Sequence, residues 1–351
     1  RLIEEGVLVL SVMEETPAET AGLRKDDVIV AIDGTSVEGL TQEDVVNRLR
    51  GRSGTEVLLA IEREDADPRS LMVARSHIVP QTVAYHPEGN LAYIRVSGFN
   101  NRTADSLRQK IRQAQNELAG ELRGYILDLR GNPGGLLEQA VAVSDIFVTS
   151  GRIVSTHGRH DGSHQYFPAE ELQQGDLTNN APMVVLIDGG SASASEIVAA
   201  ALQDTGRAVL VGSASFGKGT VQTVSQLSNS GELILTWARF HAPSGYALHR
   251  RGVLPDICTT GEAATPAGVM ALVQNGTLPI APELQRLEVD SSDEAAVETL
   301  RAYCPSREGD EEIDMTVARQ LLQEPGLYAR ALHRTPDTAA SAVAVTPASG
   351  S

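Results

Sequence analysis

A lysine in a glycine-rich segment raises the first question of chemistry. Gly212, Gly217 and Lys218 have the spacing of a phosphate-binding loop, G-x-x-x-x-G-K. Gly219 stands where such a loop needs a Ser or Thr hydroxyl for magnesium. The β-branched residues that follow, in T-V-Q-T-V, favour a strand rather than the helix that holds a phosphate. The segment therefore does not predict a nucleotide site.

Lys218 is instead suited to act as a general base. A lone lysine is usually a solvated surface charge, but Phe216 and Val221 are apolar neighbours. Loss of hydration in such surroundings lowers the pKa of a lysine amine, and the neutral amine accepts a proton. In the predicted strand, Lys218 and Gln222 lie on the same face. We expect Lys218 to be the base, with Gln222 beside it.

Three serines in D-G-G-S-A-S-A-S-E, residues 188–196, supply candidate nucleophiles. A strand, a tight Gly-Gly turn, a serine and a helix expose a hydroxyl beside free backbone N–H groups. Ser193 and Glu196 also have the spacing of a capping box, which is a purely structural role. The two roles can coexist at one helix start.

Short elements before residue 65 predict a small β-rich domain. Thr41 and Asp44 resemble a capping pair at the start of its main helix. From residue 90, strands alternate with helices, which predicts a mainly parallel sheet covered by helices. The pattern after Cys258 is helical, and residues 335–351 have the composition of a disordered tail.

The composition excludes some partners. The 351 residues carry a net charge of −17, with 41% hydrophobic and 4% aromatic residues. This acidity and the lack of a basic patch argue against nucleic acid, and no apolar run is long enough for a membrane span. Cys258 and Cys304 decide neither the redox compartment nor their own pairing. Because Arg1 almost directly precedes a strand, we expect the chain to begin inside a domain, and no signal peptide is visible.

Five motifs occur in the order of a known peptidase family. They are T-P-A-E-T-A-G-L-R-K-D-D-V-I-V-A-I-D-G, G-Y-I-L-D-L-R-G-N-P-G-G, S-A-S-A-S-E-I-V-A-A-A-L-Q-D, F-G-K-G-T-V-Q, and A-P-S-G with G-V-L-P-D-I. From about residue 6 to 258 the chain resembles the carboxyl-terminal processing peptidases, or tail-specific proteases. These are serine endopeptidases with a PDZ domain and a Ser-Lys dyad.

This resemblance implies an α/β fold, with a crotonase/Clp-like peptidase core, an N-terminal β-rich PDZ domain and a helical C-terminal extension. The expected domains are residues 1–65 for the truncated PDZ domain, 66–260 for the core, 261–334 for the extension and 335–351 for the tail.

The resemblance also implies the roles of site residues. Ser193 matches the nucleophile, Lys218 the base and Gln222 the residue that orients the lysine. The backbone N–H groups of Ala194 and Gly135 match the oxyanion hole, with Gly134 as the rival of Gly135. Asp128 and Arg130 are expected to support the glycine turn.

The implied partner is a protein substrate with a free C-terminal tail. The carboxylate-binding loop of the PDZ domain would lie before residue 1, so only Val45 and Leu49 are proposed as peptide-binding residues, and both could equally be core. No cofactor is implied, and the family works in the periplasm, cell envelope or thylakoid lumen. The alternative is a catalytically silent PDZ scaffold.

His157, His160 and His164 in H-G-R-H-D-G-S-H could suggest a zinc site. Apart from Asp161, no cysteine or carboxylate near them completes a ligand set, and the stretch is rich in glycine. We therefore expect solvated loop histidines and no metal.

Overall fold

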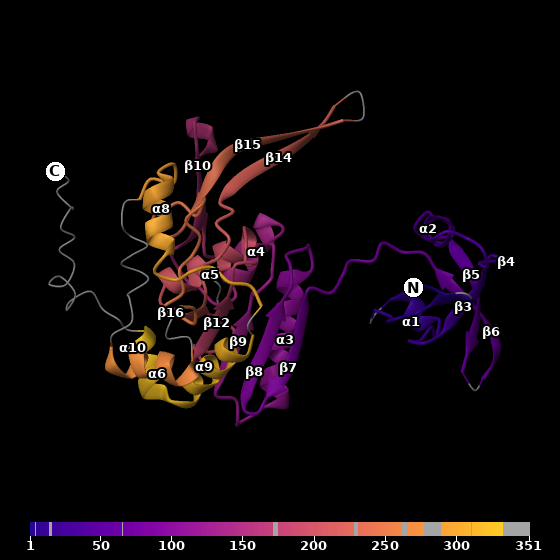
Figure 1. Cartoon of the computed structure of the whole chain (residues 1–351), viewed down its shortest axis with the longest axis horizontal. Helices are drawn as coiled ribbons and strands as arrows, with labels where there is room; N and C mark the ends of the chain where they lie inside the picture. The colour runs from indigo at the N-terminus through magenta and orange to yellow at the C-terminus, as the bar shows by residue number, and fades with distance from the viewer. Residues whose placement is uncertain are drawn as a thin grey trace. The chain divides into compact units, whose positions relative to one another are not determined.

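The computed structural model describes residues 1–351 except 4, 14–15, 65, 171–174, 228–230, 262–264, 277–288, 310 and 333–351, so the predicted tail lies outside the described residues. The chain divides into two compact units, Arg1–Gln81 and Thr82–Ser351 (Figure 1). No helix among the described residues is long and apolar enough to cross a membrane.

The first unit is a small antiparallel sheet with two helices. Its strand order is β1 (Leu2–Ile3), β2 (Gly6–Leu8), β3 (Val28–Ile32), β5 (Glu56–Arg63) and β6 (Ala66–Ala74), with β4 (Thr35–Ser36) beside β3. The helices are α1 (Pro17–Thr20) and α2 (Gln42–Leu49). The predicted capping pair is confirmed: Asp44 N donates to Thr41 Oγ1 at 3.2 Å, and Thr41 N donates to Asp44 Oδ2 at 3.1 Å.

The predicted domain boundary at residue 65 is too early. The charged stretch that looks like a linker, E-D-A-D-P-R-S, runs into β6, which pairs along its length with β5. A Pro and charged side chains are tolerated there because β6 is an edge strand.

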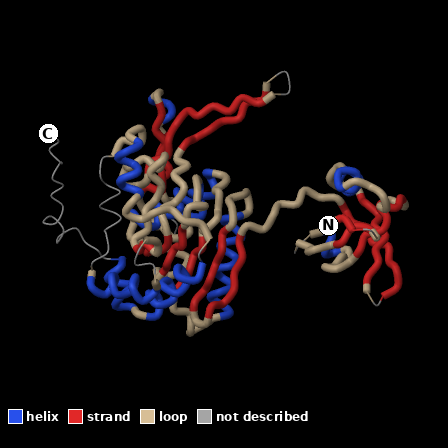
Figure 2. The backbone as a smooth tube through the Cα atoms, in the orientation of Figure 1, coloured by secondary structure: helices blue, strands red, loops and turns tan. Residues whose placement is uncertain are grey.

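The second unit contains a six-stranded sheet that is mainly parallel, as predicted. Its order is β16 (Ile257–Cys258), β13 (Val209–Gly212), β12 (Met183–Ile187), β9 (Gly124–Asp128), β8 (Leu91–Val96) and β7 (Val83–Glu88), with only β7 antiparallel to its neighbour. Figure 2 shows these strands enclosed by helices. Strands β9, β12 and β13 are buried along their whole length, which explains why they read as continuous apolar runs, whereas the edge strand β7 does not.

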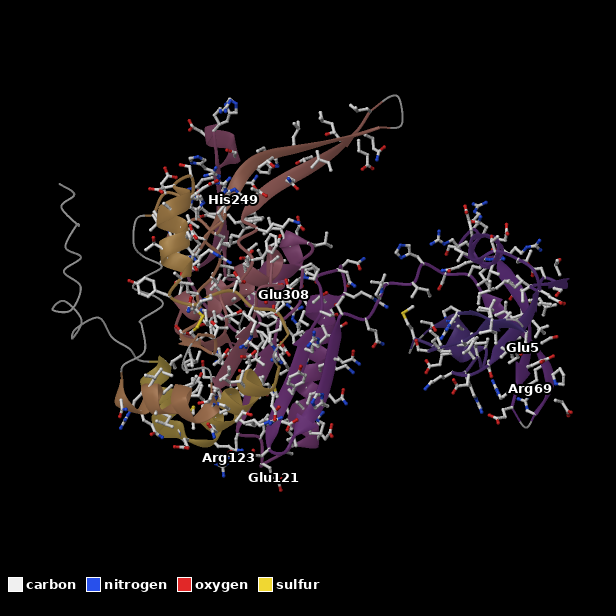
Figure 3. The ribbon with its side chains drawn as sticks, in the orientation of Figure 1. Glu5, Arg69, Glu121, Arg123, His249 and Glu308 are labelled. Atoms are coloured by element: carbon white, nitrogen blue, oxygen red, sulfur yellow. A yellow bond between two sulfur atoms is a disulfide. The ribbon has the colours of Figure 1, made fainter. Side chains whose placement is uncertain are left out.

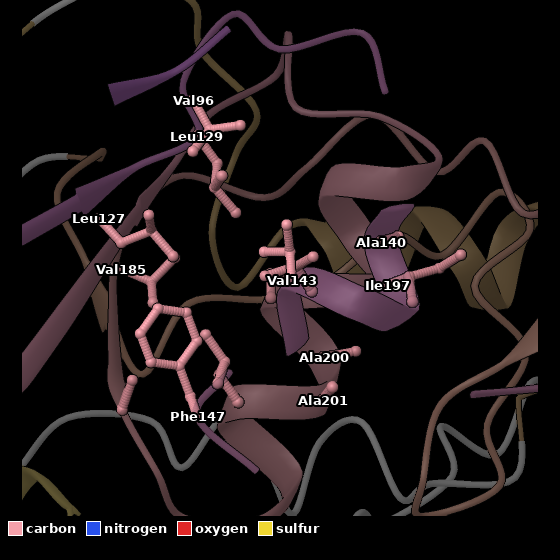
Figure 4. Close-up of a cluster of buried hydrophobic side chains, with 14 of the residues drawn as sticks. Val96, Leu127, Leu129, Ala140, Val143, Phe147, Val185, Ile197, Ala200 and Ala201 are labelled. Atoms are coloured by element: carbon pink, nitrogen blue, oxygen red, sulfur yellow. The ribbon is translucent and has the colours of Figure 1, made fainter. Parts of the chain in front are cut away.

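Two hydrophobic clusters cover the two faces of this sheet. Leu127 and Val185 face α3 (Thr103–Glu117), α4 (Leu137–Ser144) and α5 (Ala194–Asp204), as Figure 4 shows in part. Ile126 and Val184, their chain neighbours, face α6 (Pro266–Asn275), α9 (Glu311–Gln323) and α10 (Pro325–Leu332). The C-terminal helices are therefore present as predicted, but they pack on the core sheet instead of forming a separate extension.

A second, antiparallel sheet leads away from the core. Its order is β11 (Gln165–Pro168), β10 (Arg152–Gly158), β15 (Glu232–His241) and β14 (Thr220–Gln226), with the short helix η1 (Asp161–Ser163) before β11. Beyond the part of β15 that pairs with β10, strands β14 and β15 continue as a two-stranded ribbon (Figure 1). Helix α8 (Glu294–Arg301) completes the unit's described elements.

Candidate active site

Three loops meet where neighbouring parallel strands end. Strands β9, β12 and β13 are adjacent, and their carboxyl ends lead into residues 131–135, 188–193 and 213–218. These are the segments that sequence analysis selected for the oxyanion hole, the nucleophile and the base. The carboxyl edge of a parallel sheet is the usual place for a ligand site in such folds.

Only the middle one of the three serines is available for chemistry. Ser191 and Ser195 are both completely buried. The Ser191 hydroxyl donates to Leu129 O at 2.8 Å, and the Ser195 hydroxyl donates to Asn132 O at 2.9 Å. Ser193 is half-buried. Its φ of 58° is one that residues other than glycine rarely adopt, and such backbone strain is typical of functional sites.

A buried carboxylate connects the serine segment to the lysine segment. Glu196 is 0% exposed, and its Oε2 accepts from Ser193 N at 2.7 Å and from Lys218 N at 2.9 Å. Its Oε1 accepts from Gly217 N at 2.7 Å and from Ser215 Oγ at 2.5 Å. Burial raises the pKa of the Glu196 carboxyl, and the hydrogen bonds from Ser215 and the three amides oppose that rise. Sequence analysis identified Glu196 only as a helix cap and missed this second set of contacts.

Replacing Glu196 with glutamine is expected to lower kcat about 10- to 100-fold with little change in KM. An amide group offers N–H where two donors need an acceptor, and unmatched buried donors cost about 1–3 kcal/mol each. Steady-state kinetics and urea unfolding measure both effects. Glu138→Gln, in the exposed first turn of α4, is the matched control and should change neither. Full activity of the Glu196 variant would contradict the positioning role.

The lysine segment is locked in place by its neighbouring glycines. Arg250 N donates to Gly217 O at 2.7 Å, and a Cβ on Gly219 would lie 2.1 Å from the amide nitrogen of His249, which Figure 3 labels. The Lys218 side chain itself is exposed. The predicted loss of hydration is therefore wrong for this state, because the apolar neighbours do not enclose the amine: Phe216 is itself 60% exposed.

The strand predicted after Lys218 is confirmed as β14, but Gln222 has another partner. Its Nε2 donates to Thr236 Oγ1 at 3.0 Å, across the ribbon on β15. The Gln222 side chain is thus held by the ribbon rather than by the lysine in this structure.

The turn after β9 distinguishes the two candidate glycines for the oxyanion hole. Gly134 N donates to Asn132 Oδ1 at 2.9 Å, so it is already engaged. Gly135 pairs with Phe99 as an isolated parallel bridge: Phe99 N donates to Gly134 O at 3.0 Å, and Leu136 N donates to Phe99 O at 2.9 Å. These bonds use the carbonyl before Gly135 and the amide after it, so the N–H of Gly135 points away from Phe99. Within the described part of the chain, neither Gly135 N nor Ala194 N donates a backbone hydrogen bond. A Cβ on Gly134 would lie 2.8 Å from Ser193 Cβ and 2.9 Å from Ala194 N, so this turn contacts the serine directly.

A buried ionic network lies beneath this turn. Arg130 donates to both Asp128 oxygens, at 3.0 and 2.7 Å, and to Asp314 Oδ2 on α9 at 3.1 Å. Tyr93 OH donates to Asp128 Oδ2 at 2.6 Å. Burial, then the charge of Asp128, raises the pKa of Tyr93 to about 12, and the hydrogen bonds of Arg130 keep the Asp128 pKa low despite burial. Asp128 and Arg130 are therefore placed as supports of the turn.

The prediction of solvated loop histidines is wrong for His157, which lies partly buried on β10, whereas His160 and His164 are exposed and flank η1. His157 stacks on His164 and His241, with ring centroids 5.0 and 4.2 Å apart. His160 precedes η1 and is not part of this stack. Among the described residues, no group of three or more His, Cys, Asp or Glu side chains is arranged to hold a metal ion.

The two cysteines form a disulfide. Cys258 at the end of β16 and Cys304 after α8 are bonded, with their Cα atoms 5.7 Å apart (Figure 3). The bond links the core sheet to the segment that follows α8. Whether the two cysteines pair could not be decided from the sequence.

The first unit contains a cavity of about 540 Å³ beside α2. Val46 and Leu49 line it, together with Met13, Pro17 and Val73. Val45, by contrast, is 4% exposed and packs in the core with Ile29 and Ile61, so its prediction as a peptide-binding residue is wrong. On α2, Val45 faces the sheet, whereas Val46 on the adjacent face lines the cavity. Sequence analysis did not propose Val46 as a peptide-binding residue.

Comparison with known proteins identifies the families that the two units match. Residues 90–259 match peptidase family S41, and residues 8–63 match the PDZ domain. The carboxy-terminal-processing protease of Bartonella bacilliformis is 44% identical over 253 residues, 72% of this chain and 58% of that protein. Carboxyl-terminal-processing peptidase 3 of Arabidopsis thaliana, described as chloroplastic, is 32% identical over 304 residues, 81% of this chain and 56% of that protein.

A solved structure, the photosystem II D1 C-terminal processing protease, is 31% identical, with 73% of this chain and 70% of that chain covered and a TM-score of 0.44. The chain thus spans little more than half the length of the two relatives named above. On these matches, the chain belongs to peptidase family S41 and carries a PDZ domain.

Proposed function

We propose that this chain is a serine endopeptidase that cleaves protein substrates near their C-terminus through a Ser193–Lys218 dyad. The observation that carries the proposal is the Glu196 carboxylate, which holds the amides of both residues. A carboxylate buried for capping alone would have no need of the lysine segment. The names of the relatives support cleavage at a C-terminal region.

In the first half of the reaction, the neutral Lys218 amine takes the proton of Ser193 Oγ, and the oxygen attacks the scissile carbonyl. The N–H groups of Ala194 and Gly135 stabilise the resulting oxyanion. Lys218 then gives its proton to the leaving amine as the C–N bond breaks, which leaves an acyl-enzyme on Ser193.

In the second half, water attacks the acyl carbonyl while Lys218 takes its proton, and the ester bond to Ser193 breaks. Lys218 returns that proton to Ser193 Oγ, so the free enzyme is regenerated. These steps draw on side chains and backbone amides of this chain alone, and no cofactor enters the proposal.

The PDZ cavity is the proposed receptor of the substrate tail. Its lining by Val46, Leu49 and Val73 suits an apolar side chain near the end of an extended peptide, as in binding by strand addition. This assignment makes the PDZ unit a determinant of affinity, separate from the chemistry.

Val46→Lys is expected to raise KM for a substrate with an apolar C-terminal tail about tenfold, with kcat unchanged. The lysine side chain would remove apolar contact between the cavity and the substrate tail. A tenfold weaker binding corresponds to about 1.4 kcal/mol. Asn47→Lys, on the exposed face of α2, adds the same charge outside the cavity and is the control. Equal KM values for the two variants would contradict the assignment.

A serine-reactive fluorophosphonate tests the peptidase against the silent PDZ scaffold. The exposed lysine and the engagement of Gln222 with Thr236 are the observations that favour the scaffold. A peptidase should be labelled at Ser193, and mass spectrometry of the digested protein identifies the labelled residue. Failure to label, under conditions that label a known serine peptidase, would favour the scaffold.

We place the protein outside the cytoplasm. The Cys258–Cys304 disulfide suits an oxidising compartment, and one relative is described as chloroplastic. Non-reducing peptide mapping of the natively isolated protein tests this, and free thiols at both positions would count against it.

A further inference from the structure

Among the described edge strands longer than two residues, β14 alone lacks the residues that normally protect an edge. Its seven residues, T-V-Q-T-V-S-Q, contain neither a charge nor a proline. Among the described edge strands longer than two residues, β6 contains Asp67 and Pro68, β7 contains Pro87, and β11 contains Pro168. Proteins normally use such residues to prevent another strand from adding to an edge. An edge without them is suited to accept one.

The backbone of β14 has its free hydrogen-bonding groups at defined positions. Phe240 N donates to Gly219 O, and Leu227 N donates to Gly231 O, so residues 219 and 227 both face β15. Because the direction alternates along an antiparallel strand, the even-numbered residues between them, including Thr220 and Gln226, present N–H and C=O to the free edge.

The ribbon also exposes apolar side chains on β15, so it has an apolar surface on both faces. Leu233, Ile234 and Leu235 are 42, 57 and 52% exposed, and because they are consecutive they lie on both faces. Figure 3 shows side chains standing out along the ribbon. A two-stranded ribbon is marginally stable in water, whereas three strands with an apolar face are stable.

This edge begins at the proposed base. Thr220 is two residues after Lys218, and a strand rises about 3.3 Å per residue, so the edge starts roughly 7 Å along the chain from the lysine. We propose that β14 is the docking strand for the substrate: an extended, uncharged segment adjoining the scissile bond adds to its free edge. The proposal rests on the peptidase function given above.

The choice of a substrate over other occupants follows from this continuity. A chain paired with Thr220 is led directly to the residue that must receive the serine proton. The segment is expected to be uncharged and rich in β-branched residues, because the edge supplies no charged partner. The net charge of −17 further disfavours an acidic segment.

Peptide substrates with single backbone N-methyl groups test the docking directly. N-methylation removes the N–H that a paired strand donates, so the effect should alternate with period two. We expect kcat/KM to fall at least fivefold at alternate positions on one side of the scissile bond, and to change less than twofold at the positions between them. Absence of alternation on both sides would overturn the proposal.

A pair of variants tests the enzyme side. Gln226→Pro removes an outward N–H, which an edge strand tolerates, and Gln226→Ala removes only the side chain that bonds Glu232. Each kcat/KM for a long peptide is divided by that for a short N-acyl amino-acid ester that cannot reach β14. This ratio should be at least fivefold lower for the proline variant than for the alanine variant, and equal ratios would overturn the proposal.

Sedimentation of both variants detects another occupant. If proline at 226 converts a dimer into a monomer, a second copy of the chain occupies the edge and the proposal fails. Failure of the wild-type chain to cleave any peptide or ester would instead remove the peptidase function. Cleavage without N-methyl alternation would remove only the docking strand.

Discussion

Replacing Ser193 with alanine is expected to abolish peptide cleavage while the chain stays folded. Loss of the nucleophile of a covalent mechanism lowers kcat by about 10⁴-fold or more. The backbone bond from residue 193 to Glu196 does not involve the hydroxyl, so the serine loop should keep its position. Loss of a helix cap costs about 1 kcal/mol, which is small for a chain of this size. Assays of peptide cleavage and urea unfolding measure the two effects.

The flanking serines provide matched controls for this variant. Ser195→Ala removes a buried hydroxyl that bonds the carbonyl of Asn132, so we expect about 1 kcal/mol less stability and continued cleavage. Ser191→Ala also removes the oxygen that accepts from Asp188 N at 3.0 Å, so we expect about 1–3 kcal/mol less stability and continued cleavage. An active Ser193→Ala protein together with an inactive Ser191 or Ser195 variant would contradict the nucleophile assignment.

Features set by local sequence were predictable. The capping pair of Thr41 and Asp44 follows from spacing alone, because both partners lie within one helical turn. The parallel sheet follows from short apolar runs such as M-V-V-L-I, which are typical of strands buried on both faces and which alternate here with helical segments. Of the three serines, only Ser193 is not fully buried. The strand–turn–helix pattern is compatible with this choice, but it was the family resemblance that selected Ser193.

Features set by distant contacts were not predictable. Glu196 receives the amides of Gly217 and Lys218 from more than twenty residues away, and no periodicity in the sequence reports such a pair. The partners β10 and β15 are still farther apart in the sequence, and no periodicity in either segment indicates that they pair. Exposure of Lys218 could not be read from its neighbours, because Phe216 points to solvent instead of covering it.

Lys218→Arg is expected to be inactive, although it keeps the positive charge. Arginine remains protonated at any working pH and cannot accept the serine proton, whereas lysine can. A lysine that served only as a surface charge would tolerate the change. Comparison of kcat/KM for the two proteins across pH 6 to 10 is the measurement, and the wild-type value should rise with pH because only the neutral amine acts as the base.

The control is Lys110→Arg on α3, where the partly buried lysine donates to Gln113 Oε1 at 3.3 Å and the substitution should leave cleavage unchanged. Folding of both variants can be compared by urea unfolding, since Lys218 N keeps its bond to Glu196 whatever the side chain. The buried carboxylate holds the backbone, so a loss of activity at residue 218 reports on the amine itself. An arginine variant with most of its activity would therefore exclude Lys218 as the base, while the Ser193 assignment would stand on its own test.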